Sequence, residues 1–350
     1  MSVIDLIKPH KLVPGDKVAT VTLSWGGPSI FKNRYEVGVK QLEETFGLKV
    51  VPMENTLSAD DYIYQNPQKR AQDLMNAFAN PEIKAIISTI GGDETIRLLP
   101  YIDFDLIRKN PKIFLGYSDT TANHFMCLKA GITSFYGPTI MAGFGENGGL
   151  PAYLKESILK TLFDNKTIGE IKPSAEGWTN EFLDWGNPEN QNIKRKLKPS
   201  KWNFLQGNTK VTGHLIGGCM EVLEMMKGTA LWPDTNMFKG AILFFESCTK
   251  EAVPDIFSYW LRNYCASGII EMASGIIFGR PGGDDLPQSY FDTYDEIIRR
   301  VFKEYNLQDK PVITQMDFGH TDPMFTIPYG VKAEIDCVNQ KFSILENAVI

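Results

Sequence analysis

One segment sets the architecture of the first half of this chain: Lys84-Ala85-Ile86-Ile87-Ser88-Thr89-Ile90-Gly91-Gly92-Asp93-Glu94. A continuous apolar run ends in a glycine turn, and a helical pattern follows. The same succession recurs from Lys17 and from Lys112. Short apolar strands that alternate with helices are typical of a parallel sheet whose two faces are both covered. We therefore predict an α/β fold.

The pattern of predicted strands, helices and irregular segments divides the chain into three parts. At 350 residues it is too long for one ordinary core, so two domains are expected. The α/β pattern fills residues 1–150, an irregular connecting segment with an aromatic loop fills 151–207, and a C-terminal domain of mixed β/α structure fills 208–350. In the last part we predict strands at 241–245, 275–278 and 311–314, helices at 219–226, 254–264 and 294–305, and an antiparallel strand pair within 329–345.

The overall charge and hydropathy exclude some classes of function. The formal net charge is -6 and the isoelectric point is near 5.4, whereas a protein that binds nucleic acid polymers needs clustered positive charge. No apolar run approaches the roughly 20 residues that cross a bilayer, and the first residues lack the apolar core of a signal peptide. We expect a cytoplasmic protein that binds neither nucleic acid polymers nor membranes.

Metal, disulfide and nucleotide-cofactor chemistry have little support in the sequence. The five cysteines are widely spaced without a C-x-x-C pair, which disfavours a disulfide framework and a cysteine-based zinc site. The four histidines show no H-x-x-x-H spacing. Glycines at 143, 145 and 148 match a dinucleotide fingerprint, but they do not follow the first strand of a βαβ unit. We therefore expect no metal and no organic cofactor.

A serine follows the apolar strand that begins at Lys112, in the sequence Gly116-Tyr117-Ser118-Asp119. A helix begins directly behind it, and such a sharp turn lifts a hydroxyl out of a sheet toward the helix N-terminus. The match to G-x-S-x-G is partial, because Thr120 stands in place of the second glycine. The alternative is that Ser118 or Asp119 only caps the helix.

The glycine turn at Gly91-Gly92 has the same topological position one βα unit earlier. Ligands collect at the carboxyl ends of parallel strands, so both turns are expected to face one crevice. The backbone N–H groups of Gly92 and Asp119 are then candidates for an oxyanion hole. The alternative is a tight turn that needs only the backbone freedom of glycine.

An acid and a histidine stand in comparable places in the second half. Glu246 ends an apolar strand, and His320 lies in a turn-rich loop after another strand. A serine hydroxyl becomes a nucleophile when a neighbouring imidazole takes its proton, and a carboxylate holds that imidazole in the right tautomer. Ser118, Glu246 and His320 are the candidates for these three roles, although Glu246 read in isolation is equally a capping or solvated acid.

Several short motifs keep a common order across nearly the whole chain. They are Lys11-Leu12-Val13-Pro14-Gly15-Asp16-Lys17-Val18, Gly91-Gly92-Asp93-Glu94, Gly116-Tyr117-Ser118-Asp119, Leu215-Ile216-Gly217-Gly218, Phe245-Glu246-Ser247 and Gly319-His320. Together they resemble the LD-carboxypeptidase and microcin C self-immunity peptidase family. The resemblance implies a flavodoxin-like N-terminal domain, a C-terminal domain of mixed β structure, and an active site between them.

The resemblance also implies the chemistry. It assigns a catalytic triad to Ser118, Glu246 and His320 and an oxyanion hole to Gly92 and Asp119, and it implies no metal or organic cofactor. Members of this family are usually homodimers, so we expect a homodimer.

Two activities divide the family. LD-carboxypeptidases remove the terminal D-residue of a murein tetrapeptide, whereas immunity-type members cut the amide between an acidic aminoacyl group and a nucleotide analogue. The segment 177–185 is similar to the long aromatic loop of the immunity branch. We expect its aromatic side chains to stack on a base and a lysine after the strand that ends at Glu246 to attract phosphate; these residues are Trp178, Phe182, Trp185 and Lys250.

Three alternatives stay open at this point. The tryptophans of the loop equally serve to pin it to the body of the protein. The activity is that of a murein LD-carboxypeptidase if the aromatic loop is not a base platform. A non-catalytic module that binds nucleotides or small ligands is the interpretation from a different class.

Overall fold

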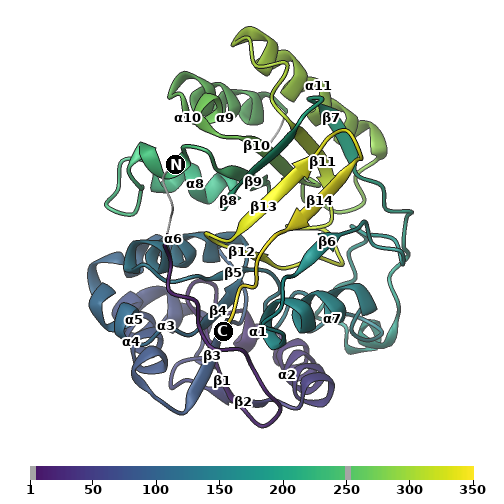
Figure 1. The fold of residues 1–350 in the computed structure, drawn as a ribbon. Coiled ribbons are helices and arrows are strands. Elements are labelled where there is room, and N and C mark those ends of the chain that lie inside the picture. Colours follow the sequence, from purple (N-terminus) through teal and green to yellow (C-terminus); the bar gives the residue numbers. More distant parts are fainter. Residues whose placement is uncertain (1–4, 249–253) are drawn as a thin grey trace.

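The computed structural model describes residues 5–248 and 254–350. Two sheets dominate it, and in Figure 1 the N-terminal half of the chain, in purple and blue, lies below the green and yellow C-terminal half. The first sheet has the strand order β12-β5-β4-β3-β1-β2. Strands β1 to β5 pair in parallel with one another, and β12 pairs antiparallel with β5. The strands are β1 (Lys17–Val21), β2 (Lys49–Pro52), β3 (Ile83–Ser88), β4 (Ile113–Gly116), β5 (Phe135–Tyr136) and β12 (Ile327–Pro328).

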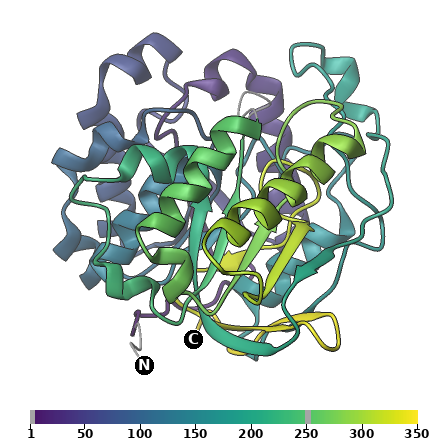
Figure 2. The ribbon, with the colours of Figure 1, turned by 90° about the horizontal axis from the view of Figure 1, so that it is seen from above.

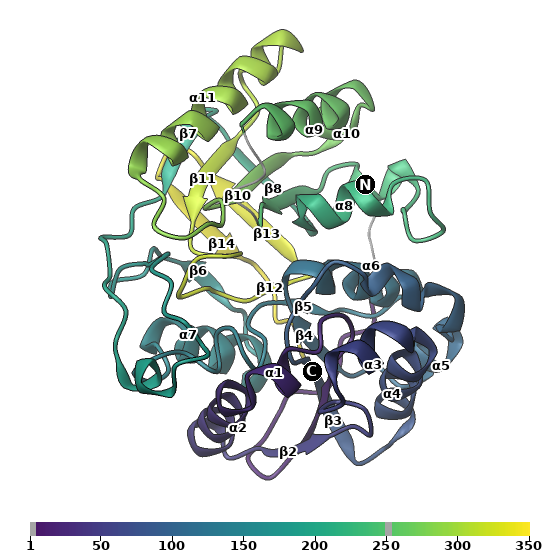
Figure 3. The same cartoon turned by 180° about the vertical axis from the view of Figure 1, so that it is seen from behind.

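The order of β1 to β5 in this sheet is 2-1-3-4-5, which is the order of flavodoxin-like folds. Helices α3 to α6 lie on one side of the sheet, and α1 and α2 lie on the other (Figures 1 and 3). The buried pattern of β4, where all four residues are buried, fits this two-sided cover. The helices are α1 (Gly27–Ile30), α2 (Lys32–Phe46), α3 (Asp60–Gln65), α4 (Pro67–Ala79), α5 (Phe104–Lys109) and α6 (Thr121–Ala130).

The second sheet is mixed and has the strand order β6-β14-β13-β8-β9-β10-β11-β7. Its centre, β8 to β11, is parallel, and the strands at both edges are antiparallel. Its strands are β6 (Gly169–Ile171), β7 (Asn203–Gln206), β8 (Lys210–Cys219), β9 (Ile242–Glu246), β10 (Gly275–Gly279), β11 (Val312–Met316), β13 (Lys332–Asp336) and β14 (Lys341–Ile344).

Helices cover one face of the second sheet, which is the face nearest the viewer in Figure 3. They are α8 (Met220–Met226), α9 (Pro254–Ala266), α10 (Ile269–Met272) and α11 (Gln288–Glu304), while α7 (Ala152–Ile158) lies near β6. No helix in residues 5–248 or 254–350 has the length and apolar character needed to span a membrane. The predicted fold class is thus confirmed: a flavodoxin-like parallel-sheet part and a mixed β/α part.

Most predicted elements are present, with shifts at their ends. The helix predicted at 294–305 begins earlier, at Gln288. Pro287 lies directly before its first turn, where a proline ring does not interrupt the helical hydrogen bonds. A run of 3-10 turns (Thr95–Tyr101) replaces the helix predicted after Gly91-Gly92, and Pro100 inside it explains why no α-helix forms.

Some connections join parts of the chain that are far apart in sequence. Strand β12 comes from the C-terminal half and extends the first sheet, while β6 and β7, from the segment 151–207, extend the second. The C-terminal end lies beside the purple N-terminal segment in Figure 2, where the N–H of Ile350 donates to the carbonyl of Pro9. The division at residues 150 and 207 stays a prediction.

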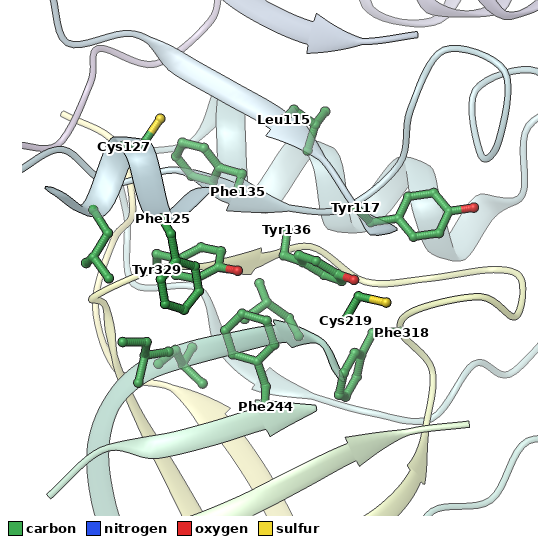
Figure 4. Packing of buried hydrophobic residues seen from close by; sticks show 14 of the residues in the cluster. Leu115, Tyr117, Phe125, Cys127, Phe135, Tyr136, Cys219, Phe244, Phe318 and Tyr329 are labelled. Carbon is green, nitrogen blue, oxygen red and sulfur yellow. The ribbon is translucent and has the colours of Figure 1, made fainter. Parts of the chain in front are cut away.

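Aromatic side chains fill the space between the two sheets (Figure 4). Tyr136 of β5, Phe244 of β9 and Tyr329 are each at most 1% exposed. Ring centroids lie 5.5 Å apart for Tyr136 and Phe244 and 5.1 Å apart for Phe244 and Tyr329. Such contacts stabilise the packing beyond the area they bury, and they hold β5 of the first sheet against β9 of the second.

Candidate active site

Ser118 lies at the sharp turn between β4 and α6. Its φ is +64°, a left-handed conformation that is uncommon for residues other than glycine and that is found at functional turns. Residues Ser118–Thr120 form one 3-10 turn before α6 begins at Thr121. The strained turn directs the side chain out of the sheet, as in a nucleophile elbow.

The structure brings Ser118, His320 and Glu246 together. The Oγ of Ser118 lies 3.0 Å from Nε2 of His320, and Nδ1 of His320 lies 2.7 Å from Oε2 of Glu246. Glu246 is 2% exposed, while the His320 side chain is 18% exposed. An Nδ1–H that donates to the carboxylate leaves Nε2 free to accept the serine proton, and this is the tautomer that a general base needs.

Glycine at position 319 allows the histidine and the acid to meet. Its φ is +90°, and a Cβ there would lie 2.7 Å from Cγ and 2.8 Å from Oε2 of Glu246. Any side chain at Gly319 would therefore push the carboxylate away from the imidazole. The motif Gly319-His320 thus has a steric reason that the sequence pattern alone does not reveal.

Tyr136 forms hydrogen bonds with both Ser118 and Glu246. Its hydroxyl accepts a hydrogen bond from the backbone N–H of Ser118 at 3.1 Å and donates a short one to Oε1 of Glu246. The phenol is buried, and burial together with the charge of Glu246 raises its pKa well above the usual value, so it stays protonated and keeps donating. Sequence analysis missed this residue, because β5 is only two residues long and carries no recognisable strand pattern; its place beside β4 becomes visible only in the fold.

The imidazole of His320 is more basic than usual. Burial lowers its pKa, but the charge and hydrogen bond of Glu246 outweigh burial and raise the pKa to about 9. At neutral pH the free site therefore holds mainly the imidazolium form. The neutral base that accepts a proton from Ser118 becomes the major form only in alkaline solution.

The turn after β3 lies against the serine. A Cβ at Gly91 would lie 2.9 Å from Cβ and 3.0 Å from Oγ of Ser118, so glycine is needed here for close approach. The carbonyl of Gly91 accepts a hydrogen bond from the N–H of Trp25 at 3.2 Å. Since carbonyl and N–H point in opposite directions across a trans peptide, the N–H of Gly92 points away from Trp25.

The side chain of Asp119 fastens this turn to the elbow. Its Oδ2 accepts hydrogen bonds from the N–H groups of Glu94 at 3.0 Å and Thr95 at 2.8 Å. The residue is fully buried. The two candidate oxyanion donors, the N–H groups of Gly92 and Asp119, thus belong to segments that one carboxylate ties together.

A cavity opens beside His320, and two of the predicted binding residues line it. Its wall includes Arg34, Tyr117, Phe182, Trp185, His320 and Asp322. Phe182 is 55% exposed, and the ring of Trp185 packs on the guanidinium of Arg34 at 4.7 Å. A flat aromatic surface therefore stands on the same cavity as the imidazole.

Charged side chains also line this cavity, among them Arg34, Arg195 and Asp322. Arg195 makes ion pairs with Glu146 and, at 2.6 Å, with Asp322. Burial lowers the pKa of Arg34 to about 10, against the opposing charge of Glu146, so this guanidinium stays positively charged. Sequence analysis missed Arg34, which contributes from α2, far from the aromatic loop in sequence.

Trp178 and Lys250 are the other two predicted binding residues. Trp178 does not line the cavity: it is 4% exposed, packs edge-on against Phe291, and lies under Arg280 at 4.5 Å. Its assignment to substrate stacking is corrected accordingly, because a buried ring has no free face for a base. Lys250 lies outside the described residues.

His124 and the glycine pattern at 143–148 have structural roles. His124 is fully buried, with Nδ1 2.9 Å from Ser134 Oγ and Nε2 2.9 Å from the carbonyl of Gly116, and burial lowers its pKa to about 3. The glycine pattern at 143–148 forms turns, and the next helix begins only at Ala152. Among the described residues, one group of potential metal ligands is found, at Cys219, Glu221 and Cys248.

A flavodoxin-like sheet with a serine elbow, joined to a mixed sheet that supplies an acid and a histidine, defines a class of peptidases. Two family models match this chain: the LD-carboxypeptidase N-terminal domain at residues 18–137 and the LD-carboxypeptidase C-terminal domain at residues 212–335. The chain belongs to the LD-carboxypeptidase family.

Relatives cover nearly the whole chain. The microcin C7 self-immunity protein MccF of Escherichia coli is 34% identical over 97% of this chain and 98% of its own length. A probable murein peptide carboxypeptidase of Bacillus subtilis is 27% identical over 98% of this chain and 95% of its own.

Solved structures agree in fold. MccF in complex with aspartyl sulfamoyl adenosine has a TM-score of 0.84 at 32% identity, covering 98% of this chain and 100% of that one. An MccF-like protein from Streptococcus pneumoniae in complex with AMP has a TM-score of 0.82 at 30% identity, covering 94% of this chain and 98% of that one. The resemblance inferred from the short motifs is confirmed.

Proposed function

We propose that this peptidase is a serine hydrolase in which Ser118 is the nucleophile, His320 the general base and Glu246 the residue that orients and charges the imidazole. The single observation that carries the proposal is the continuous hydrogen-bond chain from Ser118 Oγ through His320 to Glu246, at 3.0 and 2.7 Å. The left-handed backbone at Ser118 supports it, because capping a helix needs no such conformation.

The proposed reaction is acyl transfer to water. Ser118 Oγ attacks the amide carbonyl as its proton passes to Nε2 of His320, and the oxyanion is stabilised by the N–H groups of Gly92 and Asp119. The imidazolium then protonates the leaving nitrogen, and the C–N bond breaks to leave an acyl-enzyme. Water attacks the ester with His320 again as base, which releases the acid and restores Ser118.

The proposed substrate is an amide between an acidic aminoacyl group and a nucleotide analogue. The MccF structures that resemble this chain contain aspartyl sulfamoyl adenosine and glutamyl sulfamoyl guanosine. In this chain the cavity beside His320 offers Phe182 and Trp185 for stacking on the base. Arg34 adds a buried positive charge on the same wall, which suits an anionic group, and Lys250 stays a proposed contact for phosphate.

The deciding experiment compares two substrates by mass spectrometry: aspartyl sulfamoyl adenosine and a murein tetrapeptide ending in D-alanine. We expect the wild type to cleave the first, and Ser118→Ala to lose roughly 10^5-fold or more in kcat while still folding. Ser134→Ala is a matched control, because it also removes a buried serine–histidine hydrogen bond, to His124, and neither residue is one of the proposed reacting groups. Its rate should stay near that of the wild type.

Each other outcome has a defined meaning. Cleavage of the tetrapeptide alone would assign the chain the second candidate function, murein LD-carboxypeptidase. The similarity to the Bacillus subtilis protein favours this alternative. Tight binding of AMP without cleavage of either compound would support a non-catalytic module instead. We further propose that the protein acts in the cytoplasm as a homodimer.

A further inference from the structure

Two thiols and a carboxylate meet behind the proposed catalytic acid. Cys219 ends β8, Glu221 lies in the first turn of α8, and Cys248 follows β9. In the part of the chain that the structure describes, these three form a group whose potential ligand atoms all lie within 4.8 Å of one another. Neither the proposed reaction nor the substrate cavity uses any of them.

The two sheet strands explain how distant cysteines come together. Cys219 is the parallel partner of Glu246 across β8 and β9, so Cys248 lies two residues beyond that pair. The Sγ of Cys219 donates a hydrogen bond to Oε2 of Glu221 at 3.1 Å. Figure 4 shows Cys219 at the edge of the aromatic cluster, on the side where the Tyr136 hydroxyl lies. The lack of C-x-x-C spacing therefore does not exclude a cysteine site here, since the sheet provides the proximity.

A surrounding shell holds the carboxylate of Glu221 in place. Its Oε1 accepts hydrogen bonds from Ser247 Oγ at 2.7 Å and from the N–H of Cys248 at 2.9 Å. Oε2 is thereby turned toward the thiol of Cys219. Carboxylate ligands of protein metals are typically oriented by outer hydrogen bonds of this kind.

The spacing and the ligand types fit one class of ion. In tetrahedral zinc sites with Zn–S near 2.3 Å and Zn–O near 2.1 Å, ligand atoms are separated by roughly 3.6–3.8 Å. The three atoms here lie within 4.8 Å of one another, so shifts of a few tenths of an ångström to about one ångström admit an ion. Thiolates select soft or borderline cations, whereas Mg²⁺ and Ca²⁺ require oxygen ligands.

We propose that Cys219, Glu221 and Cys248 bind one thiophilic divalent cation of the Zn²⁺ class, with water as the fourth ligand. On binding, two S–H bonds break and both protons leave to solvent, while the hydrated ion releases all but one of its waters and forms two Zn–S bonds and one Zn–O bond to Glu221, without any change of oxidation state. The ion links Cys248, two residues after Glu246, to the first turn of α8.

The test uses the whole protein under reducing conditions with Co²⁺ and Zn²⁺ as probes. We expect one Co²⁺ per chain, a thiolate-to-cobalt charge-transfer absorption, its loss on addition of Zn²⁺, and a higher Tm with Zn²⁺ but not with Mg²⁺. Cys219→Ser and Cys248→Ser should each abolish the absorption and the Tm increase. Ser247→Ala, which removes one hydrogen bond to Glu221, should weaken Zn²⁺ binding by roughly 10- to 100-fold.

Cys337→Ser is the matched control, because Cys337 is a half-buried free thiol on a different part of the second sheet. It should leave stoichiometry and affinity unchanged. Thermal unfolding without metal checks that each variant folds. The proposal is overturned if Co²⁺ binds without a thiolate band, if the band survives in both cysteine variants, or if Cys219 and Cys248 form a disulfide in the protein as isolated.

Discussion

The hydroxyl of Tyr136 donates a hydrogen bond to the carboxylate of Glu246, and this contact joins β5 of the first sheet to β9 of the second. The same oxygen accepts the N–H of Ser118. One phenol therefore sets the distance between the backbone of the proposed nucleophile and the proposed acid. A change in the packing of the two sheets would alter both contacts together.

Removing this hydroxyl should affect turnover more than binding. In Tyr136→Phe the buried carboxylate loses one donor, and we expect kcat to fall by roughly 10- to 100-fold with little change in KM, since hydrogen bonds to charged groups contribute about 1.5–3 kcal/mol. Steady-state kinetics with the cleaved substrate measure both constants.

Tyr329→Phe provides the comparison for that variant. Tyr329 is also buried in the aromatic cluster, but its hydroxyl donates to the carbonyl of Gly217 at 2.6 Å. We expect Tyr329→Phe to lower the free energy of unfolding by about 1 kcal/mol and Tyr136→Phe by about 1.5–3 kcal/mol, because only Tyr136 donates to a charged group. Equal losses of kcat in the two would show that Tyr136 acts only through packing, and would contradict a positioning role.

The raised pKa of His320 predicts an alkaline pH profile. Since the pKa is about 9 and the neutral imidazole is the base, kcat/KM should rise about tenfold per pH unit below that value and level off above it. In Glu246→Gln the charge that raises the pKa is gone and burial, which lowers it, remains. The midpoint of the profile should then move to lower pH, with a maximum lower by roughly 10^3- to 10^4-fold. A midpoint that stays in place would show that Glu246 does not control the imidazole.

Continuous apolar strands and glycine turns made the first sheet readable from the sequence, because a strand buried on both faces leaves an unbroken hydrophobic run. Strand β5, at two residues, and β12, also of two residues, carry no such signal. Strand β5 forms because tertiary packing places it against β4, and β12 forms because it pairs with β5. Tyr136 lies at the carboxyl end of β5. Long-range pairing, not local propensity, decides these elements.

The same distinction separates the parts of the candidate site. Ser118 and His320 each follow a recognisable strand and Glu246 ends one, so their positions near strand ends could be predicted, and the family motifs then grouped them. Trp178 and Trp185 occur seven residues apart in one irregular loop, and nothing in their local sequence tells the buried ring from the one on the cavity. Only the fold around a loop determines which aromatic face stays open.

A methyl group at position 91 should impair catalysis without unfolding the protein. The added Cβ would meet Cβ and Oγ of Ser118 at 2.9 and 3.0 Å, so the serine must move. A misplacement of about 1 Å lowers turnover by roughly 100-fold, because the reacting groups lose their alignment. We expect Gly91→Ala to show that loss in kcat, with circular dichroism and Tm close to those of the wild type. Full activity in this variant would mean that the turn after β3 does not approach the nucleophile as described.

The two tryptophans of the aromatic loop should respond in opposite ways to the same substitution. Leucine preserves apolar volume but offers no flat ring, so Trp185→Leu should raise KM for aspartyl sulfamoyl adenosine by roughly 5- to 150-fold, which corresponds to the 1–3 kcal/mol of one stacked base. The kcat should change little, because Trp185 stands on the cavity wall and not among the reacting groups.

Trp178→Leu removes a ring that packs against Phe291 and lies under Arg280, so it should lower the free energy of unfolding by about 1–3 kcal/mol and leave KM unaltered. A murein tetrapeptide has no base to stack, and its KM should be insensitive to both changes. If Trp185→Leu weakened both substrates equally, the ring would act by supporting Arg34, whose guanidinium it covers, and the nucleotide-facing role would fall.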